Sequence, residues 1–179
     1  MSPGPGHGEG LAPSAWVARF APLVAAGGAV LDIASGSGRH ARFFLARNHP
    51  VTAVDRDLSG LADIDDARLA RVEADLEGGR PWPLGPARFA AVVVTNYLHR
   101  PLFGPILGAL AARGVLIYET FAQGNERFGR PRNPDFLLRP GELLEVARHG
   151  GLRVLAYEDL EVATPRPACI QRICAAAPG

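Results

Sequence analysis

The segment Val30–Gly38, which reads VLDIASGSG, constrains the fold of this chain more than any other. It opens with a short, mostly apolar run that is typical of a buried strand, and it passes directly into a glycine-containing turn. A helical pattern follows over residues 39–47, with Phe43, Phe44 and Leu45 on its apolar side. Glycines let a ligand approach the backbone, and the first turn of a helix offers free N–H groups. This order predicts the first unit of an α/β sheet with a ligand site at the turn.

The rest of the chain repeats the alternation of strands and helices. Strands are expected at 29–33, 51–54, 69–74, 89–95, 114–120, 152–162 and 168–176. Helices are expected at 14–24, 39–47, near residue 58, at 101–112 and at 140–149. Such alternation implies a mostly parallel sheet, and the short turn between the last two strands makes them antiparallel. We therefore predict an α/β, Rossmann-like fold: a seven-stranded, mostly parallel sheet with helices on both faces and a C-terminal antiparallel hairpin.

Length and composition exclude several classes of protein. A chain of 179 residues suits one domain, which we place at 11–179 after a Gly/Pro-rich, disordered tail at 1–10. The 19 basic and 18 acidic residues nearly cancel, so neither a nucleic-acid partner nor a membrane partner is expected. The sequence shows no signal-peptide pattern, and we expect a cytoplasmic protein. The chain has no lysine, which excludes Schiff-base and P-loop chemistry, and its two cysteines, Cys169 and Cys174, predict no metal site.

Two acids near the glycine turn indicate the kind of cofactor. Asp55 follows Gly36 by nineteen positions, close to the spacing of about 20 that is typical of a ribose-binding acid. The run 36–41, GSGRHA, also matches the dinucleotide pattern Gly-x-Gly-x-x-Ala, so NAD has to be considered. Asp32 weighs against NAD, because its charge would face the pyrophosphate at the helix N-terminus. S-adenosylmethionine (SAM) has no phosphate and carries a cationic sulfonium, so the residues favour SAM.

Four segments, VLDIASGSG, AVDRD, EADLE and VVVTNYLHR, resemble the motifs of class I SAM-dependent methyltransferases. The resemblance runs from about residue 29 to 175 and is strongest over 30–100. It departs at Ala34, where the family often has glycine. Within the class, the chain is similar to short bacterial methyltransferases of the tellurite-resistance type, and the stretch YETFAQGNERFGRPRNPDFLLRPGELL carries that similarity.

The resemblance implies roles for individual residues in cofactor binding. Asp55 would hold the ribose hydroxyls, and Asp75 with Leu76 would contact the adenine. Both acids could equally be ordinary turn residues at strand ends. The implied cofactor-binding residues are Asp32, Ala34, Ser35, Gly36, Gly38, Asp55, Arg56, Asp75, Leu76, Thr95 and Asn96.

The methyl acceptor is expected beyond the carboxyl ends of the strands, where ligands bind in open α/β sheets. His99 is the best proton acceptor there, since its unperturbed pKa lies near neutrality, and Arg100 beside it completes the expected catalytic pair. A structural histidine at a helix start is the alternative. The expected substrate-binding residues are Tyr97, Glu119, Arg127 and Arg132. The last two lie in the aperiodic segment 121–139, which is either a solvated loop or a lid that holds an anionic acceptor.

The sequence thus predicts an SAM-dependent methyltransferase that acts on a small-molecule acceptor by in-line displacement at the sulfonium methyl. Two alternatives stay open: an NAD(P)-dependent oxidoreductase and a non-catalytic SAM-binding module. The sequence leaves the choice between monomer and homodimer open, and it does not name the acceptor.

Overall fold

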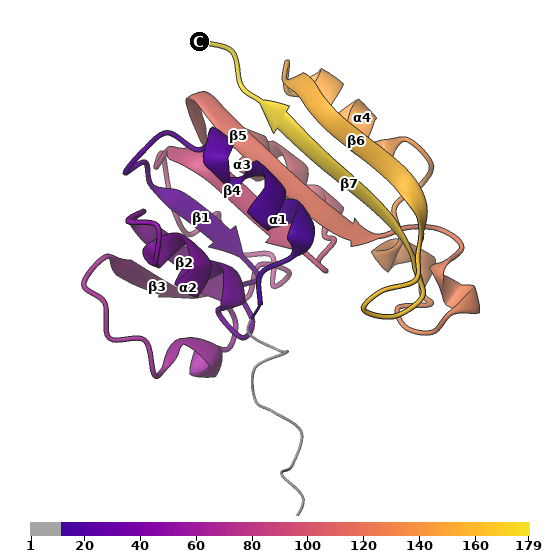
Figure 1. Ribbon diagram of the computed structural model, residues 1–179, viewed down its shortest axis with the longest axis horizontal. Helices are drawn as coiled ribbons and strands as arrows, with labels where there is room; N and C mark the ends of the chain where they lie inside the picture. The colour runs from indigo at the N-terminus through magenta and orange to yellow at the C-terminus, as the bar shows by residue number, and fades with distance from the viewer. Residues whose placement is uncertain (1–11) are drawn as a thin grey trace, which may run out of the picture.

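The computed structural model describes residues 12–179, and the tail expected at 1–10 lies outside the described residues. Its centre is a seven-stranded sheet of order β3-β2-β1-β4-β5-β7-β6 (Figure 1). The strands are β1 (Val30–Ile33), β2 (Val51–Asp55), β3 (Leu69–Glu73), β4 (Phe89–Thr95), β5 (Leu110–Phe121), β6 (Arg153–Val162) and β7 (Ala168–Ala176). The α-helices are α1 (Ala15–Phe20), α2 (Arg39–Leu45), α3 (Phe103–Gly108) and α4 (Glu142–His149). Five short 3-10 turns are η1 (Ala21–Leu23), η2 (Ser59–Leu61), η3 (Arg100–Leu102), η4 (Asn125–Arg127) and η5 (Pro134–Phe136).

The strand pairing confirms the predicted fold class. β1 pairs in parallel with β2 and β4, and the parallel ladder continues outward to β3 on one side and β5 on the other. β7 runs antiparallel to both of its neighbours, β5 and β6. From β1 the chain first adds β2 and β3 on one side of the sheet and then adds β4 and β5 on the other side. Open α/β sheets form a crevice at such a switch point, beyond the carboxyl ends of the strands. The topology therefore places a ligand site above the ends of β1, β2 and β4.

Apolar residues fill both faces of the sheet. On one face, Trp16 of α1 and Phe44 of α2 pack in a buried cluster with β-strand residues. On the other face, Ile106 of α3 and Leu143 of α4 join a second cluster. Figure 1 shows the resulting layers, with α1 and α2 covering the face toward the viewer. No helix within residues 12–179 is long and apolar enough to cross a membrane.

Two expected helices are shorter in the structure. The helix expected at 101–112 is confined to Phe103–Gly108, because β5 already begins at Leu110, which pairs with Phe89. A bulge in that ladder and the left-handed backbone of Arg113 absorb the extra residues. The helix expected near residue 58 is only the 3-10 turn η2. That turn lies against the glycine turn after β1, which leaves no space for a full helical turn with side chains at this point.

Candidate functional site

The turn after β1 owes its shape to glycines and to the turn that packs behind it. Ala34, Gly36 and Gly38 all have left-handed backbones, with φ of 54°, 51° and 73°. A Cβ on Gly60, in η2, would overlap the carbonyl oxygen of Gly36, so the two backbones approach as closely as glycine permits. A Cβ on Gly36 itself would meet no atom nearer than 3.9 Å. The turn is thus closed on the η2 side and open on the other, where a ligand can reach its backbone.

Asp55, at the end of β2, ties that turn to the neighbouring strand. Its Oδ2 accepts a hydrogen bond from the Gly36 N–H at 2.8 Å, and its Oδ1 accepts one from the Asp57 N–H at 3.0 Å. A carboxylate oxygen has more than one lone-pair site, so both oxygens retain capacity for a ligand hydroxyl. Asp55, the expected ribose-binding acid, therefore also stabilises the turn by accepting backbone hydrogen bonds. Its position at a strand end did not by itself predict this second role.

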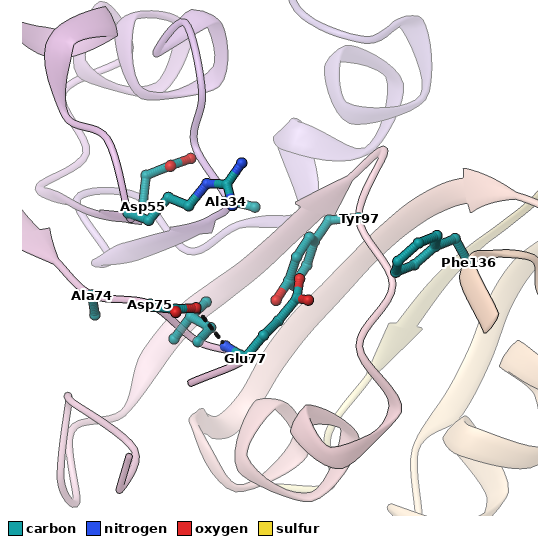
Figure 2. A pocket seen from close by; sticks show the side chains of 9 residues that line it. Ala34, Asp55, Ala74, Asp75, Glu77, Tyr97 and Phe136 are labelled. Carbon is teal, nitrogen blue, oxygen red and sulfur yellow. Dashed lines mark hydrogen bonds between the residues drawn. The ribbon is translucent and has the colours of Figure 1, made fainter. Parts of the chain in front are cut away.

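A cavity of about 550 Å³ lies above the ends of β1 to β4, and we call it the acidic cavity (Figure 2). Its lining consists of Ala34, Asp55, Arg56, Ala74, Asp75, Leu76, Glu77, Tyr97 and Phe136. Three carboxylates face one guanidinium, so the lining carries a net charge of −2 when all four groups are ionised. Five residues that the sequence assigned to a cofactor meet here: Ala34, Asp55, Arg56, Asp75 and Leu76. Such a lining suits a cationic ligand.

Tyr97, expected at the acceptor, instead lines the acidic cavity. In Figure 2 the Tyr97 ring and the Glu77 carboxylate point toward one another from opposite walls. Burial and then the negative charge of Glu77 raise the pKa of Tyr97, so its phenol stays protonated at neutral pH. Asp75 holds this wall in shape, because its Oδ1 accepts a hydrogen bond from the Glu77 N–H at 3.0 Å.

Beneath the turn lies a buried polar pair, Asp32 and His40. Both are at most 2% exposed, and Asp32 Oδ1 is 3.9 Å from His40 Nδ1. Burial raises the pKa of Asp32 to about 7 and lowers that of His40 to about 3. Within residues 12–179 no group hydrogen-bonds to Asp32 Oδ2 or to Ser35 Oγ. Buried polar atoms normally have partners, so these two atoms beside the turn are candidates to interact with a ligand.

A second cavity, of about 340 Å³, lies above β4 and β5 next to the start of α1, and we call it the basic cavity. Its charged lining residues are Arg39, Glu119, Arg166 and Arg172. Glu119 Oε1 accepts a hydrogen bond from the Ser14 hydroxyl at 2.7 Å, and Oε2 lies 3.2 Å from Arg172 Nη1. Of the four expected acceptor-binding residues, Glu119 is the one that this cavity contains.

The structure places Asn96 and Thr95, at the end of β4, differently than expected. Asn96 lines the basic cavity, and its backbone is left-handed with φ of 54°. The next residue, Tyr97, lines the acidic cavity, so the two cavities come together at this point of the backbone. Asparagine adopts the left-handed region more readily than other non-glycine residues, so it suits this turn at the end of β4. Thr95 lines neither cavity.

His99 and Arg100 line neither of these two cavities. His99 lines a third cavity, of about 580 Å³, formed with the segment 73–83, which shares the wall at residues 74–77 with the acidic cavity. Arg100 holds segments of the protein together. Its Nε lies 2.7 Å from Glu142 Oε1, and its other nitrogens donate hydrogen bonds to the carbonyl oxygens of Asp135 and Leu137. Glu142 is 3% exposed, so this ion pair anchors α4 and the segment before it. The structure does not bring the expected catalytic pair to a common site with Glu119.

The segment 121–139 is folded rather than extended. Leu138 forms a bridge with Ala122, and the buried Asn125 donates through Nδ2 to the Pro131 carbonyl at 3.1 Å. Arg127 pairs with Glu161, and exposed Arg132 lines none of the cavities described above. The segment instead contributes Phe136 to the acidic cavity and Phe121, its first residue, to the basic cavity.

Several residues of these cavities were not predicted from the sequence. Glu77 follows the expected adenine-side acid by two positions, and this spacing was a usable signal. Arg39 is the first residue of the helix after the glycine turn, which was a second signal. Ser14, Phe136 and Arg166 reach the site through tertiary packing from distant segments, and no local pattern marks them.

No protein-family model matches the sequence, and no curated protein matches it. Among solved structures, it is similar to a 1,6-didemethyltoxoflavin-N1-methyltransferase of Burkholderia thailandensis with bound S-adenosylhomocysteine: TM-score 0.68, 20% identity, covering 93% of this chain and 78% of that one. It is also similar to TehB of Haemophilus influenzae (TM-score 0.72, 14% identity, 90% and 61% covered) and to an S-adenosylmethionine-dependent methyltransferase of Mesorhizobium loti (TM-score 0.70, 16% identity, 91% and 98% covered). The chain therefore has the fold of SAM-dependent methyltransferases.

The fold by itself does not define the reaction. A [4+2]-cyclase, SpnF, matches as well, with a TM-score of 0.64 and 16% identity over 89% of this chain and 80% of that one. Unrelated reactions often use one fold, so the function has to be argued from the site.

Proposed function

We propose that this protein is an SAM-dependent methyltransferase that acts on a small molecule. The observation that carries the proposal is the acidic cavity, which opens at the glycine turn and has a net charge of −2. A cationic sulfonium with an amino-acid tail complements this charge, whereas the pyrophosphate of NAD would be repelled by it. The buried Asp32 beside the turn adds to the argument, because its unpartnered Oδ2 can accept from a cationic amino group.

The residues present fit SAM in detail. We assign the ribose to Asp55 and the adenine to Asp75 and Leu76. The methionine part is assigned to the turn Ala34–Gly38, with Asp32 and Ser35 as polar partners. Arg56 is assigned to the ribose side and Asn96 to the methyl end, whereas Thr95 receives no role because it lines neither cavity. When bound, SAM supplies an electrophilic methyl group on a sulfonium.

The protein's own contribution is positioning and exclusion of water, which can supply much of the acceleration of a displacement reaction. Asn96 lines the basic cavity, and the next residue, Tyr97, lines the acidic cavity, so a nucleophile held in the basic cavity would lie beside the methyl end of the cofactor. Glu119 is already engaged by Ser14 and Arg172, and we do not assign it as a general base. We also leave His99 without a catalytic role, because it faces the third cavity.

Calorimetric titration with SAM, S-adenosylhomocysteine and NAD tests the proposal, followed by a methyl-release assay over oxygen, nitrogen and sulfur nucleophiles. We expect SAM and S-adenosylhomocysteine to bind and NAD not to bind. Binding of NAD alone would overturn the assignment. Binding of SAM without transfer to any nucleophile would favour a SAM-binding module or a non-methylating reaction of the kind that the SpnF fold supports.

A further inference from the structure

We propose that the basic cavity is the acceptor site and that it selects a small acceptor bearing an anionic group, which Arg39 and Arg166 bind. The inference rests on the proposed function, since it names the acceptor of the same reaction. It depends on three features of the cavity: its place beside the cofactor, its unused positive charge, and its size.

The two cavities adjoin but are separate. Asn96 and Tyr97 are consecutive, and they line the basic and the acidic cavity respectively. The same division occurs after β1, where Ala34 lines the acidic cavity and Arg39, at the start of α2, lines the basic one. No residue lines both cavities. A molecule in the basic cavity therefore lies next to a cofactor in the acidic cavity without competing for its contacts.

The positive charge in the basic cavity is only partly used. Arg172 is engaged by Glu119 and by Glu158, to which its Nε donates at 2.7 Å. Arg39 and Arg166 make no ion pair and no side-chain hydrogen bond within residues 12–179. With respect to residues 12–179, their guanidinium groups therefore have N–H donors available, in the planar geometry that matches carboxylate and phosphate oxygens. With three arginines and one glutamate, the charged lining has a net charge of +2, opposite to the acidic cavity.

The cavity also limits what can accompany the anionic group. Its volume of about 340 Å³ is near the lower end of the roughly 300–1,000 Å³ of typical ligand sites. Phe121 forms an apolar wall, and the Arg166 guanidinium lies 5.9 Å from the centre of its ring. A short aliphatic carboxylate, a carboxylate with one aromatic ring, or a small inorganic oxyanion fits this combination of size, apolar wall and two guanidinium groups in the lining.

The test compares ligands that differ only in charge. Protein saturated with S-adenosylhomocysteine is titrated with 4-hydroxybenzoate, with its neutral amide 4-hydroxybenzamide, and with inorganic phosphate at constant ionic strength. We expect the carboxylate or phosphate to bind at least about 10-fold more tightly than the amide. The anion that binds more tightly shows whether the cavity recognises an organic carboxylate or an inorganic oxyanion.

Single substitutions assign the effect to the cavity. Arg39→Gln and Arg166→Gln should each weaken anion binding about 10-fold, whereas Arg153→Gln, an exposed arginine at the start of β6, should not. Equal binding of anion and amide, absence of any anion binding, or the same loss in all three variants would overturn the inference. If wild-type protein binds SAM and only the charge preference is missing, this inference fails alone. If SAM itself does not bind, the proposed function fails.

Discussion

Asp32 and His40 form a buried pair whose protonation should leave a specific signature in the pH dependence of stability. Burial raises the pKa of Asp32 to about 7 and, with the nearby charge of Arg39, lowers that of His40 to about 3. Both side chains are therefore neutral in the folded protein near pH 5. The geometry agrees, because the Ser14 N–H donates to His40 Nε2 at 3.1 Å. That nitrogen must keep its lone pair, so the ring proton is on Nδ1, which faces Asp32.

The two groups act on stability with opposite signs. In an unfolded chain, aspartate has a pKa near 3.9 and histidine near 6.5. Between these values the folded Asp32 keeps a proton that the unfolded one has lost, so its contribution to the free energy of unfolding falls as pH rises. The unfolded His40 holds a proton that the folded one lacks, so its contribution rises with pH. On unfolding, Asp32 loses one proton and His40 gains one. In the wild type their opposite contributions to the slope of the unfolding free energy against pH therefore cancel between about pH 4 and 6.5.

A single substitution should reveal the pH dependence of the unfolding free energy that the two groups cancel in the wild type. In Asp32→Asn, the free energy of unfolding should rise with pH by about 1.4 kcal/mol per pH unit relative to wild type, or about 2 kcal/mol from pH 4.5 to 6. His40→Gln should give the opposite slope of similar size. Urea unfolding of the cofactor-free protein, followed by circular dichroism and by tryptophan fluorescence at constant ionic strength, measures both.

Two results would refute this reasoning. Variants whose pH profiles run parallel to that of the wild type would show that burial does not displace the two pKa values. A doubly protonated His40 ring in the wild type at pH 5.5, detected from its side-chain nitrogen chemical shifts, would show that the pair is ionic rather than neutral.

Three further predictions concern the cofactor turn and the segment 121–139. Asp55→Ala should weaken SAM binding about 10- to 150-fold in calorimetry, because hydrogen bonds to a charged acceptor contribute about 1.5–3 kcal/mol, while Asp57→Ala should not; equal losses would contradict the ribose assignment. Gly36→Val should abolish SAM binding, since a β-branched residue resists the φ of 51° that this turn needs, while the circular dichroism spectrum should persist because a Cβ meets no protein atom nearer than 3.9 Å; normal SAM affinity would place the cofactor elsewhere. Replacing Arg127 and Arg132 together by Gln should leave the acceptor's KM unchanged, and a raised KM would restore segment 121–139 as the acceptor clamp.

The fold was predictable because its signals are local. β1, β2 and β4 are short, mostly apolar runs, and β1 with its glycine turn is recognisable within nine residues. Boundaries that depend on pairing were less predictable. The start of β5 at Leu110 is decided by its partner Phe89 across the sheet, whereas an apolar run rich in alanine and leucine equally suits a helix.

The site was predictable on the cofactor side and less so on the acceptor side, for a physical reason. Asp55 and Asp75 stand at strand ends, so the topology alone brings them together at one edge of the sheet. The basic cavity combines Ser14, Glu119 and Arg166, which come from the N-terminal region, β5 and the β6–β7 turn. Arg127 had the same local appearance as Arg166, but in the structure Arg127 pairs with Glu161 whereas Arg166 lines the basic cavity.

The disjoint linings of the two cavities bear on how such a protein can change during evolution. Residues of the acidic cavity lie mainly on the β1–β3 half of the sheet, whereas those of the basic cavity lie mainly around β5, β7 and the start of α1. Substitutions of residues that share no partners usually have additive effects. A lineage could therefore exchange Arg166 or Phe121 for residues that suit another acceptor while its cofactor affinity stays constant. Selection for a new substrate would act on one half of the molecule, and the other half would retain the cofactor throughout.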